Sequence, residues 1–326
     1  MKRILSGMQA SGRLHLGNLV GALQNWVRLQ DSYSCYYFVA DWHALTSGYE
    51  NPRAINQSTI DLLVNFLAAG LDPEKCTIFV QSMVPEHAEL HLILSMITPL
   101  GWLERVPTYK EKKEEITDRD LSTYGFLGYP VLQSADILLY RANLVPVVAV
   151  SLPHLEITRE IARRFNHFYG EVLPEPEALL TRYPKVPGVD GRKMSKSYGN
   201  AVYLSDSPKE VEQKIRTMMT DPARKLRTDL GNPELCPVYH LHKVFSASDE
   251  QDWVVKGCLS AGIGCIDCKK VLIKNVLGML GPIWEKRRAL MENPAYLREI
   301  AVEGSRKAGA SAKETMGAVK NALSWF

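Results

Sequence analysis

Three residues near the start of the chain, His15, Gly17 and Asn18, have types and spacing suited to binding an anion. They follow a short apolar run and several glycines, and the leucines and valines after them recur at helical spacing, so the sequence predicts a strand, a turn and a helix. A helix N-terminus presents unpaired N–H groups and the positive end of the helix dipole. The stretch therefore predicts a phosphate site, and a glycine-rich turn with a polar cap is the alternative.

A second set of candidate residues, Lys193, Ser195, Lys196 and Ser197, lies in a stretch that predicts a loop. Residues 182–200 are rich in proline, glycine, lysine and serine and have no periodicity. Ammonium groups stabilise negative charge that develops on a leaving phosphate group. A lysine-serine loop alone is usually only solvated, whereas its combination with the first stretch predicts phosphate chemistry.

Four of the six cysteines, Cys236, Cys258, Cys265 and Cys268, fall within 33 residues in the pattern C-x21-C-x6-C-x2-C. A chain of this length needs no disulfides to fold, so the clustering calls for another explanation. Four thiolates suit a tetrahedral zinc ion or a cubane iron-sulfur cluster, and the spacing alone does not choose between them. Four buried free thiols are the alternative without a metal.

Polar residues interrupt the apolar stretch 129–140 at a helical spacing. Tyr129, Gln133 and Asp136 are four and three residues apart, so they lie on one face of the predicted helix. A carboxylate there is either solvated or buried with a partner, because an unpaired buried charge is costly. Because aspartate is mostly exposed in proteins, residue statistics favour a solvated Asp136.

The composition is that of a globular enzyme of two domains. The chain has 326 residues, 46% of them hydrophobic, and a formal net charge of +3. With so balanced a charge, a nucleic acid would be bound by local basic patches. No apolar run approaches the roughly 20 residues that span a bilayer, and the N-terminus has no signal-peptide core, so we expect a cytoplasmic protein without a membrane partner.

Apolar runs alternate with helix-like stretches in the first half of the chain. The runs 35–41, 77–82 and 144–150 follow the first strand, which predicts an α/β fold with a Rossmann-like, doubly wound parallel sheet. Ligands of such sheets bind beyond the carboxyl ends of the strands, here near Gly7, His43 and Gln81. From residue 208 onward we expect a mostly helical region, with breaks at Pro208, Pro222, Pro233, Pro282 and Pro294.

Several stretches resemble a known enzyme family. HLGN (15–18) and KMSKS (193–197) resemble, in this order, the two signature sequences of class I aminoacyl-tRNA synthetases. Over the whole chain, GMQASGRLHLGNLVGALQNW, VADWHALT, ERVPTYKEK, YPVLQSADILLY, HLEITREIARRFN and DGRKMSKSYGN resemble bacterial tryptophanyl-tRNA synthetases.

The resemblance implies a homodimeric enzyme that activates tryptophan with ATP and Mg²⁺ and transfers it to tRNA(Trp). It implies a Rossmann-like catalytic domain over residues 1–190. Residues 191–326 would then hold the KMSKS loop and a helical anticodon-binding domain with the four-cysteine site.

The resemblance also assigns roles to single residues. Catalytic roles fall to His15, Asn18, Lys193 and Lys196. Tryptophan binding falls to Leu5, Gly7, His43, Tyr129, Gln133 and Asp136, with Asp136 accepting the indole N–H. ATP binding falls to Gln9, Ala10, Ser11, Gly17, Asn18, Val186, Lys193, Met194, Ser195, Lys196 and Ser197. Gln133, Leu5 and Ala10 depart from the methionine, phenylalanine and proline that are common in the family.

One departure falls in the predicted site itself. After the third residue of VPV (145–147) the family usually has a polar run with glycine, aspartate and glutamine, whereas this chain has Val148, Ala149, Val150 and Ser151. The change removes a carboxylate and an amide and leaves the Ser151 hydroxyl as a substitute. It motivates an alternative function, a paralogue that binds tRNA or tryptophan without activating the amino acid. A tyrosine-specific synthetase is a further alternative, which SADILLY (134–140) and the cysteines disfavour.

The helical region is the other place where the resemblance adds a prediction. NPELCPV and GCIDCKK are similar to a subset of these synthetases that carries a four-iron, four-sulfur cluster near the anticodon-binding surface, which favours the cluster over zinc. The basic residues Arg224, Lys225, Arg227, Lys269 and Lys270 are expected to meet tRNA phosphates. We expect no role for Cys35 and Cys76.

Overall fold

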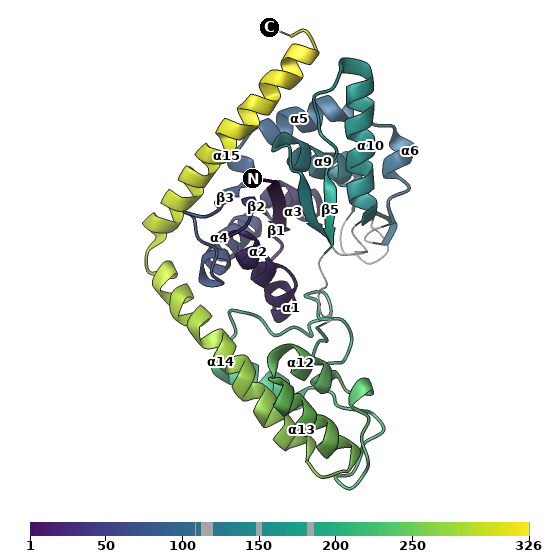
Figure 1. The fold of residues 1–326 in the computed structure, drawn as a ribbon, viewed down its shortest axis with the longest axis vertical. Coiled ribbons are helices and arrows are strands. Elements are labelled where there is room, and N and C mark those ends of the chain that lie inside the picture. The colour runs from purple at the N-terminus through teal and green to yellow at the C-terminus, as the bar shows by residue number, and fades with distance from the viewer. Residues whose placement is uncertain (108, 112–119, 148–151, 181–185, 326) are drawn as a thin grey trace.

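The computed structural model describes residues 1–107, 109–111, 120–147, 152–180 and 186–325 (Figure 1). Its centre is a five-stranded sheet in the order β3-β2-β1-β4-β5, in which every neighbouring pair is parallel. The strands are β1 (Arg3–Gln9), β2 (Ser34–Ala40), β3 (Thr77–Val80), β4 (Leu144–Val147) and β5 (Glu177–Leu180). The predicted Rossmann-like fold is therefore confirmed.

The helices cover the sheet and then continue into a separate helical region. The first group consists of α1 (Leu16–Asn18), a π-helix η1 (Leu19–Leu23), α2 (Gln24–Leu29), α3 (Asp41–Gly48), α4 (Pro52–Ala68), the 3-10 helix η2 (Gln81–Met83), α5 (Glu86–Ser95), α6 (Leu100–Leu103), α8 (Tyr124–Leu127), α9 (Tyr129–Leu139) and α10 (Leu152–Tyr169). The second group consists of α11 (Pro208–Thr217), η4 (Pro233–Leu235), α12 (Pro237–Phe245), α13 (Ser248–Leu259), α14 (Cys265–Met291) and α15 (Pro294–Ala322).

The central strands were predictable because both of their faces are buried, so they read as continuous apolar runs. The last five residues of β2 include four buried ones, and β4 is buried throughout. Strand β5 was missed, because it lies at the sheet edge, carries Glu177 and is only partly covered. In the strand order, β1 lies between β2 and β4. Strands β2 and β3 are added on one side of β1, and β4 and β5 on the other. The connections on the two sides diverge beside β1 and open a crevice at the carboxyl ends of these strands.

The last helix ties the helical region back to the sheet. Helix α14 runs up from the helical region, and α15 continues past the edge strand β3 toward the C-terminus (Figure 1). Gly304 of α15 lies against β3 so closely that a Cβ atom there would be 1.7 Å from the carbonyl oxygen of Ile78. A side chain at this position would therefore push the helix off the sheet.

Proline positions in the helical region were predicted only in part. Pro208, Pro233 and Pro294 each begin a helix, where the missing N–H costs nothing. Pro282 was predicted to be a break, which is wrong, because α14 continues through it. Helix α14 packs along α4, α11 and α12, and this tertiary packing outweighs the lost hydrogen bond.

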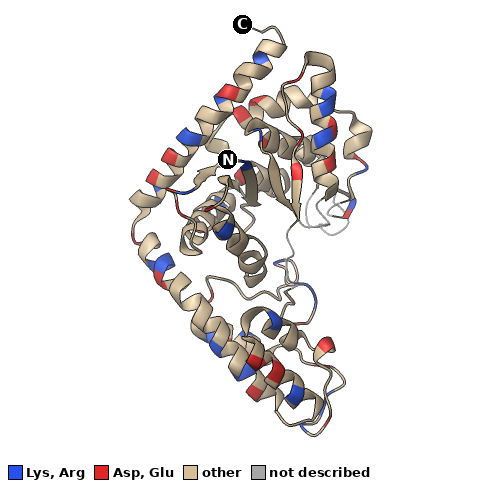
Figure 2. Cartoon of the chain, viewed as in Figure 1, with Lys and Arg blue, Asp and Glu red and all other residues tan. Residues whose placement is uncertain are grey.

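Charged residues lie mainly on the outer surfaces. Figure 2 shows basic and acidic side chains interspersed along α14 and α15, with few on the central strands. None of the described helices is long and apolar enough to cross a membrane.

Candidate active site

The two signature stretches meet in space. The Lys196 ammonium donates a hydrogen bond to the carbonyl oxygen of Gly12 at 3.0 Å, in the turn that follows β1. The segment after the KMSKS loop holds the same turn, since the backbone N–H of Leu16 donates to the carbonyl oxygen of Val202 at 2.9 Å. Residues 184 positions apart are therefore in contact, which brings the two stretches side by side.

The His15 ring lies at the start of α1, near the lysines of the KMSKS loop. Its Nδ1 atom is buried and has no hydrogen-bond partner among the described residues. Burial, together with the charges of Lys196 and Lys193, lowers the pKa of His15 to about 4, so the ring is neutral at pH 7. The Asn18 side chain accepts a hydrogen bond from the His15 backbone N–H at 3.1 Å and fixes the start of α1.

Gly17 is required by the ring of His15. A Cβ atom at position 17 would lie 2.9 Å from both Cε1 and Nδ1 of that ring. The predicted reason for this glycine was close approach of ATP to the backbone, and the structure adds a second reason, which is room for His15.

The KMSKS loop has one half-buried lysine, Lys196, and one exposed lysine, Lys193. Burial lowers the pKa of Lys196 to about 8, while Lys193 is exposed. Met194 is buried and its backbone N–H donates to the carbonyl oxygen of Val186 at 3.0 Å, which links these two predicted ATP residues. The backbone N–H of Ser195 donates to the Asn200 side chain at 2.9 Å, and the next serine, Ser197, is exposed.

The end of β1 connects this region to helix α3. The Gln9 amide donates to the carbonyl oxygen of His43 at 2.9 Å. Ala10 is buried behind it, and the Ser11 hydroxyl lies 3.5 Å from the Lys196 ammonium. The Gln9 contact joins a predicted ATP residue to a predicted tryptophan residue, His43.

Asp136 is buried, so the statistical expectation of a solvated side chain is wrong. It is 1% exposed, and its Oδ2 atom lies 2.7 Å from His43 Nε2. Its Oδ1 atom accepts hydrogen bonds from Gln81 Nε2 at 2.7 Å and His87 Nδ1 at 2.6 Å. These partners offset the cost of burying the carboxylate.

Asp136 is also ionised. Burial raises the pKa of its carboxyl, but the charge of His43 and hydrogen bonds from His43 and His87 outweigh this effect and hold the pKa at about 2. A buried, ionised carboxylate is a strong acceptor for one N–H donor of a ligand.

The other predicted tryptophan residues lie on strand β1 and helix α9. Leu5 is buried, and a Cβ atom on Gly7 would lie 2.4 Å from the Phe38 ring. The Tyr129 hydroxyl lies 3.0 Å from His154 Nε2, and Gln133 is half-buried one turn along α9. Val148, Ala149, Val150 and Ser151 lie outside the described residues.

Comparisons with known proteins decide the family. The family model for class I tRNA synthetases (W and Y) matches residues 1–281. The chain is 58% identical over 323 residues to the tryptophan–tRNA ligase of Thermotoga maritima, which covers 98% of both chains. It is 45% identical over 392 aligned positions to that of Ralstonia nicotianae, covering 99% of this chain and 98% of the relative.

The chain belongs to the bacterial tryptophanyl-tRNA synthetase family of class I.

The fold agrees with this family. A tryptophanyl-tRNA synthetase from Campylobacter jejuni, solved with ADP and tryptophan, is 34% identical with a TM-score of 0.89 and covers 99% of both chains. A Mycoplasma pneumoniae tryptophanyl-tRNA synthetase is 30% identical with a TM-score of 0.83, covering 100% of this chain and 98% of its own.

Two buried partners of Asp136, His87 and Gln81, were not predicted from the sequence. The buried Tyr140 hydroxyl, which lies 2.7 Å from His87 Nε2, was not predicted either. The signal available was QSMVPEH (81–87), a polar stretch directly after a buried strand. Its link to Asp136 spans 49 to 55 residues, so no local pattern predicts it.

A cavity lies between α3, α5, α8 and α9. Its volume is about 420 Å³, and it is lined by Trp42, Leu45, Thr46, Tyr49, Ala88, His91, Thr123, Gly125, Gly128 and Leu132. None of the predicted tryptophan residues lines it.

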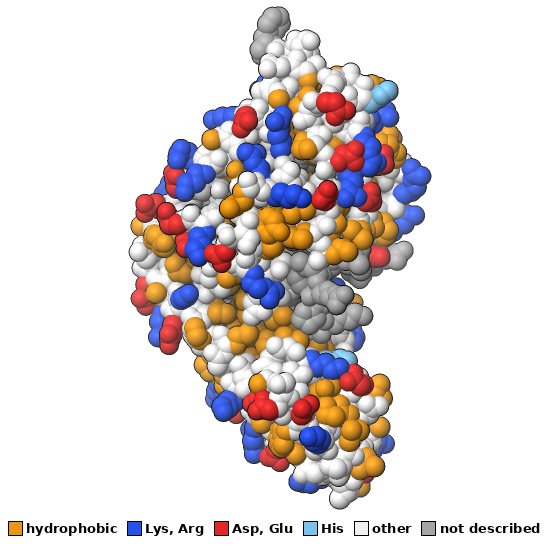
Figure 3. Space-filling model, viewed as in Figure 1, with side chains coloured by type: hydrophobic (Ala, Val, Ile, Leu, Met, Phe, Trp, Pro, Cys, Tyr) orange, Lys and Arg blue, Asp and Glu red, His pale blue; other side chains and the backbone are white. Residues whose placement is uncertain are grey.

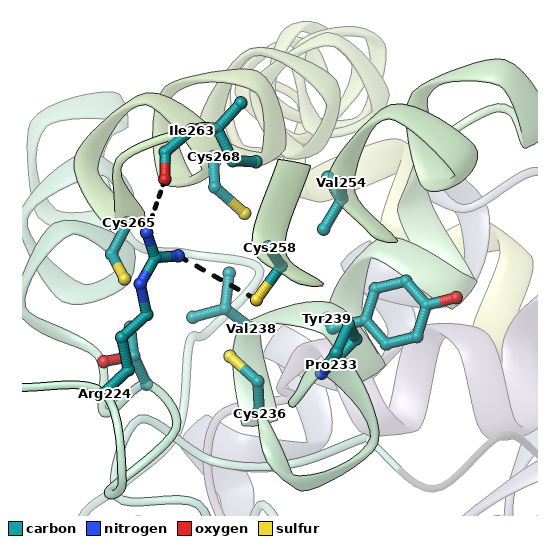
Figure 4. Close-up of a pocket in the computed structure, with 11 residues that line it drawn as sticks. Arg224, Pro233, Cys236, Val238, Tyr239, Val254, Cys258, Ile263, Cys265 and Cys268 are labelled. Carbon is teal, nitrogen blue, oxygen red and sulfur yellow. Dashed lines mark hydrogen bonds between the residues drawn. The ribbon is translucent and has the colours of Figure 1, made fainter. Parts of the chain in front are cut away.

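The four clustered cysteines line one cavity in the helical region. Figure 4 shows the sulfur atoms of Cys236, Cys258 and Cys268 facing a common space, with Cys265 beside them. Burial raises the pKa of the Cys268 thiol to about 12. Among the residues that the structure describes, no group of three or more His, Cys, Asp or Glu side chains is arranged to hold a metal ion.

Two basic residues expected at tRNA phosphates are buried instead, which corrects that prediction. Arg224 is 8% exposed, and its guanidinium donates to the carbonyl oxygen of Ile263 at 2.7 Å and lies 3.9 Å from Cys258 Sγ (Figure 4). Lys269 is also 8% exposed, and its ammonium donates to the carbonyl oxygens of Arg216 and Met218. The predictions for Arg224 and Lys269 both rested on basic residue type alone. Residue type does not distinguish a solvated cation from one that faces a buried site.

Proposed function

We propose that the chain is a tryptophan–tRNA ligase. It activates tryptophan with ATP to tryptophanyl-adenylate and pyrophosphate, and then transfers tryptophan to tRNA(Trp). The observation that carries the proposal is the contact of the Lys196 ammonium with the Gly12 carbonyl oxygen at 3.0 Å, which brings both signature stretches to one anion-binding turn.

The ATP subsite is built from the turn after β1 and the KMSKS loop. We assign the phosphates to His15, Asn18, Lys193 and Lys196, because a neutral ring with a buried, unpartnered nitrogen and two ammonium groups converge there. The remaining ATP contacts fall to Gln9, Ala10, Ser11, Gly17, Val186, Met194, Ser195 and Ser197. Mg²⁺ bound with ATP supplies further positive charge at the phosphates.

No protein nucleophile is required for activation. The carboxylate of tryptophan attacks the α-phosphate, so the enzyme contributes positioning and charge stabilisation. Lys193 and Lys196 stabilise the charge that grows on the pyrophosphate as it leaves.

The tryptophan subsite lies beside Asp136. We propose that Leu5, Gly7, His43, Tyr129, Gln133 and Asp136 form it, with the ionised Asp136 accepting the indole N–H. A ligand without that N–H leaves a buried acceptor unpaired, and this costs binding free energy.

The test is tryptophan-dependent exchange of labelled pyrophosphate into ATP, on protein purified without oxygen. Exchange with tryptophan and not with tyrosine supports the proposal. Exchange with tyrosine alone, or tRNA binding without any exchange, contradicts it, and the second result favours an activation-deficient paralogue.

We propose that the four cysteines hold a four-iron, four-sulfur cluster rather than a single zinc ion. Zinc binds four sulfurs about 2.3 Å from one centre. A cluster bonds each cysteine to a different iron atom, so its ligands lie farther apart around a larger cavity. Cys236, Cys258, Cys265 and Cys268 all line one shared cavity, and the resemblance of NPELCPV and GCIDCKK to cluster-carrying synthetases favours the cluster.

Buried cations support a metal centre of either kind at these cysteines. Arg224 and Lys269 flank the cysteines, and the Arg224 Nε atom is buried without a hydrogen-bond partner among the described residues. Four thiolates carry more negative charge than the metal centre neutralises, and buried charge needs a counter-charge. Iron and zinc analysis of anaerobically purified protein tests the proposal, and one zinc per chain without iron contradicts it.

The remaining basic residues suit tRNA binding. Lys225, Arg227 and Lys270 are exposed in the helical region, which we propose binds the anticodon, with residues 1–190 as the catalytic domain and 191–326 as the loop and anticodon-binding domain. Figure 3 shows hydrophobic side chains exposed over the same helical region, which suits contact with unstacked bases.

We also propose a homodimer. Exposed apolar side chains lie on or directly after α3, α5, α6 and α8, namely Leu45, Tyr49, Leu92, Met96, Leu100 and Tyr124. Leu45 and Tyr49 also line the 420 Å³ cavity, so the surface is both apolar and hollowed. Apolar patches of this kind mark interaction surfaces, and a two-fold axis would bury the patch against its own copy.

A further inference from the structure

We propose that His87 and Gln81 are positioning residues for amino-acid selection, because they fill both acceptor positions of Asp136 Oδ1 and leave one acceptor position, on Oδ2 beside His43, for the indole N–H. The inference rests on the proposed role of Asp136 and adds the residues that decide which oxygen faces the substrate.

The two oxygens of Asp136 are used unequally. Oδ1 accepts hydrogen bonds from Gln81 Nε2 at 2.7 Å and His87 Nδ1 at 2.6 Å, which fills the two acceptor positions of that oxygen. Oδ2 is bonded to His43 Nε2 at 2.7 Å, and we assign its second acceptor position to the substrate.

The proton positions follow from the ionised state of Asp136. An ionised carboxylate only accepts hydrogen bonds, so His87 must carry its proton on Nδ1. The other ring nitrogen, Nε2, lies 2.7 Å from the Tyr140 hydroxyl, and we assign the tautomer in which Nε2 accepts the hydroxyl proton. Tyr140 therefore donates to His87, and His87 donates to Asp136, so each donor in the chain has an acceptor.

This chain of hydrogen bonds is held rigidly. His87, Gln81 and Tyr140 are each 0% exposed. The His87 ring packs against Phe38 and Phe79, with centroid distances of 6.0 Å to each. A ring fixed by packing holds the carboxylate in one orientation, which a side chain on a loop does not do.

Stability alone does not explain such a network. A buried ionised group is commonly replaced by apolar residues with little loss or even a gain of stability. A function for the buried carboxylate and its partners follows if Oδ2 discriminates between ligands that have an indole N–H and ligands that lack it.

The experiment compares tryptophan with β-(3-benzothienyl)alanine, in which sulfur replaces the indole N–H at nearly the same size. The variants are His87→Leu, which removes the donor, and His87→Asn, whose amide N–H lies near the position of His87 Nδ1. The readout is the dissociation constant of each amino acid by calorimetry, with exchange kinetics measured alongside.

We expect His87→Leu to weaken tryptophan binding about tenfold, the size of one lost hydrogen bond to a charged group, and to leave binding of the sulfur analogue unchanged. His87→Asn should recover most of the tryptophan affinity. An equal loss for both amino acids would mean a merely structural role and would overturn the inference.

Two further variants keep the outcomes separate. Tyr140→Phe removes only the donor to His87 Nε2 and should reduce the preference for tryptophan in the same direction even if His87→Leu fails to fold. Asp136→Asn tests the proposed function itself. If that variant keeps the full preference for tryptophan over the analogue, the assignment of Asp136 fails, whereas loss of preference there without loss in His87→Leu and Tyr140→Phe rejects only the positioning role.

Discussion

The ammonium group of Lys196 and the carbonyl oxygen of Gly12 are 3.0 Å apart, although 184 residues separate them in the chain. This contact closes the KMSKS loop onto the turn that begins the first helix. It also explains why the pKa of Lys196 is lowered to about 8, since the loop buries the side chain.

Activity should therefore depend on pH through Lys196. The empty enzyme loses the ammonium charge as the pH rises through about 8, so kcat/KM for ATP in pyrophosphate exchange should fall above that pH. Lys196→Met should lower kcat/KM about 100-fold at pH 7, by analogy with removal of other groups that stabilise transition-state charge.

Two other lysine variants serve as controls for this prediction. Lys196→Arg keeps its charge at all these pH values and should remove the decline above pH 8. Lys209→Met changes an exposed lysine of α11 and should leave the profile as it is. A decline above pH 8 that persists unchanged in Lys196→Arg would assign the titration to another group.

Gly17→Ala should weaken ATP use more than tryptophan binding. The new Cβ would lie 2.9 Å from two atoms of the His15 ring, so the ring must move from the phosphate site. We expect kcat/KM for ATP to fall about tenfold, the typical effect of a misplaced catalytic group.

Gly101→Ala is the matched control for Gly17→Ala. Gly101 is also the second residue of a short helix, α6, and a Cβ atom there has no neighbour within 4 Å. The steric argument is wrong if both variants lose activity equally.

The contrast between local and distant contacts explains what the sequence could predict. Strand β2 has a continuous apolar run, and Gly17 and Asn18 lie within one turn of His15, so both were predictable from neighbouring residues. Asp136 was expected to be solvated because its partners come from three other segments, and residue type alone assigns an isolated aspartate to the surface.

Arg224 shows the same limit in the helical region. Its contact with Cys258 spans 34 residues and its contact with the Ile263 carbonyl oxygen spans 39, so the basic loop looked like a solvated surface. The cysteine spacing predicted that four thiols would gather, but it carried no information about which cations lie beside them.

Met96→Glu should weaken the proposed dimer. Met96 is 74% exposed directly after α5 and belongs to the proposed dimer surface, so a carboxylate there costs little in a monomer and much in a buried interface. Sedimentation should show a dimer for the unmodified chain and a shift toward monomer for the variant, by about tenfold or more in dissociation constant.

A charge placed elsewhere controls for the dimer prediction. Met291→Glu alters a similarly exposed methionine, 60% exposed at the end of α14, far from the patch in the chain. An unmodified chain that sediments as a monomer at micromolar concentration contradicts the proposal outright.

Arg224→Met should destabilise the four-cysteine centre without unfolding the helical region. Methionine keeps much of the apolar length of the side chain but removes the positive charge that lies 3.9 Å from Cys258 Sγ. Because burial raises the pKa of the Cys258 and Cys268 thiols, a metal centre there must displace their protons, and a nearby cation favours the thiolates.

We expect anaerobically purified Arg224→Met to contain clearly less iron per chain, and to lose iron faster in air, than Arg227→Met, which changes an exposed arginine of the same loop. Equal iron content and equal loss rates in the two variants would show that the buried guanidinium does not stabilise the centre, whereas circular dichroism that reveals unfolding of Arg224→Met alone would assign its role to the hydrogen bonds with the Ile263 and Arg227 carbonyl oxygens.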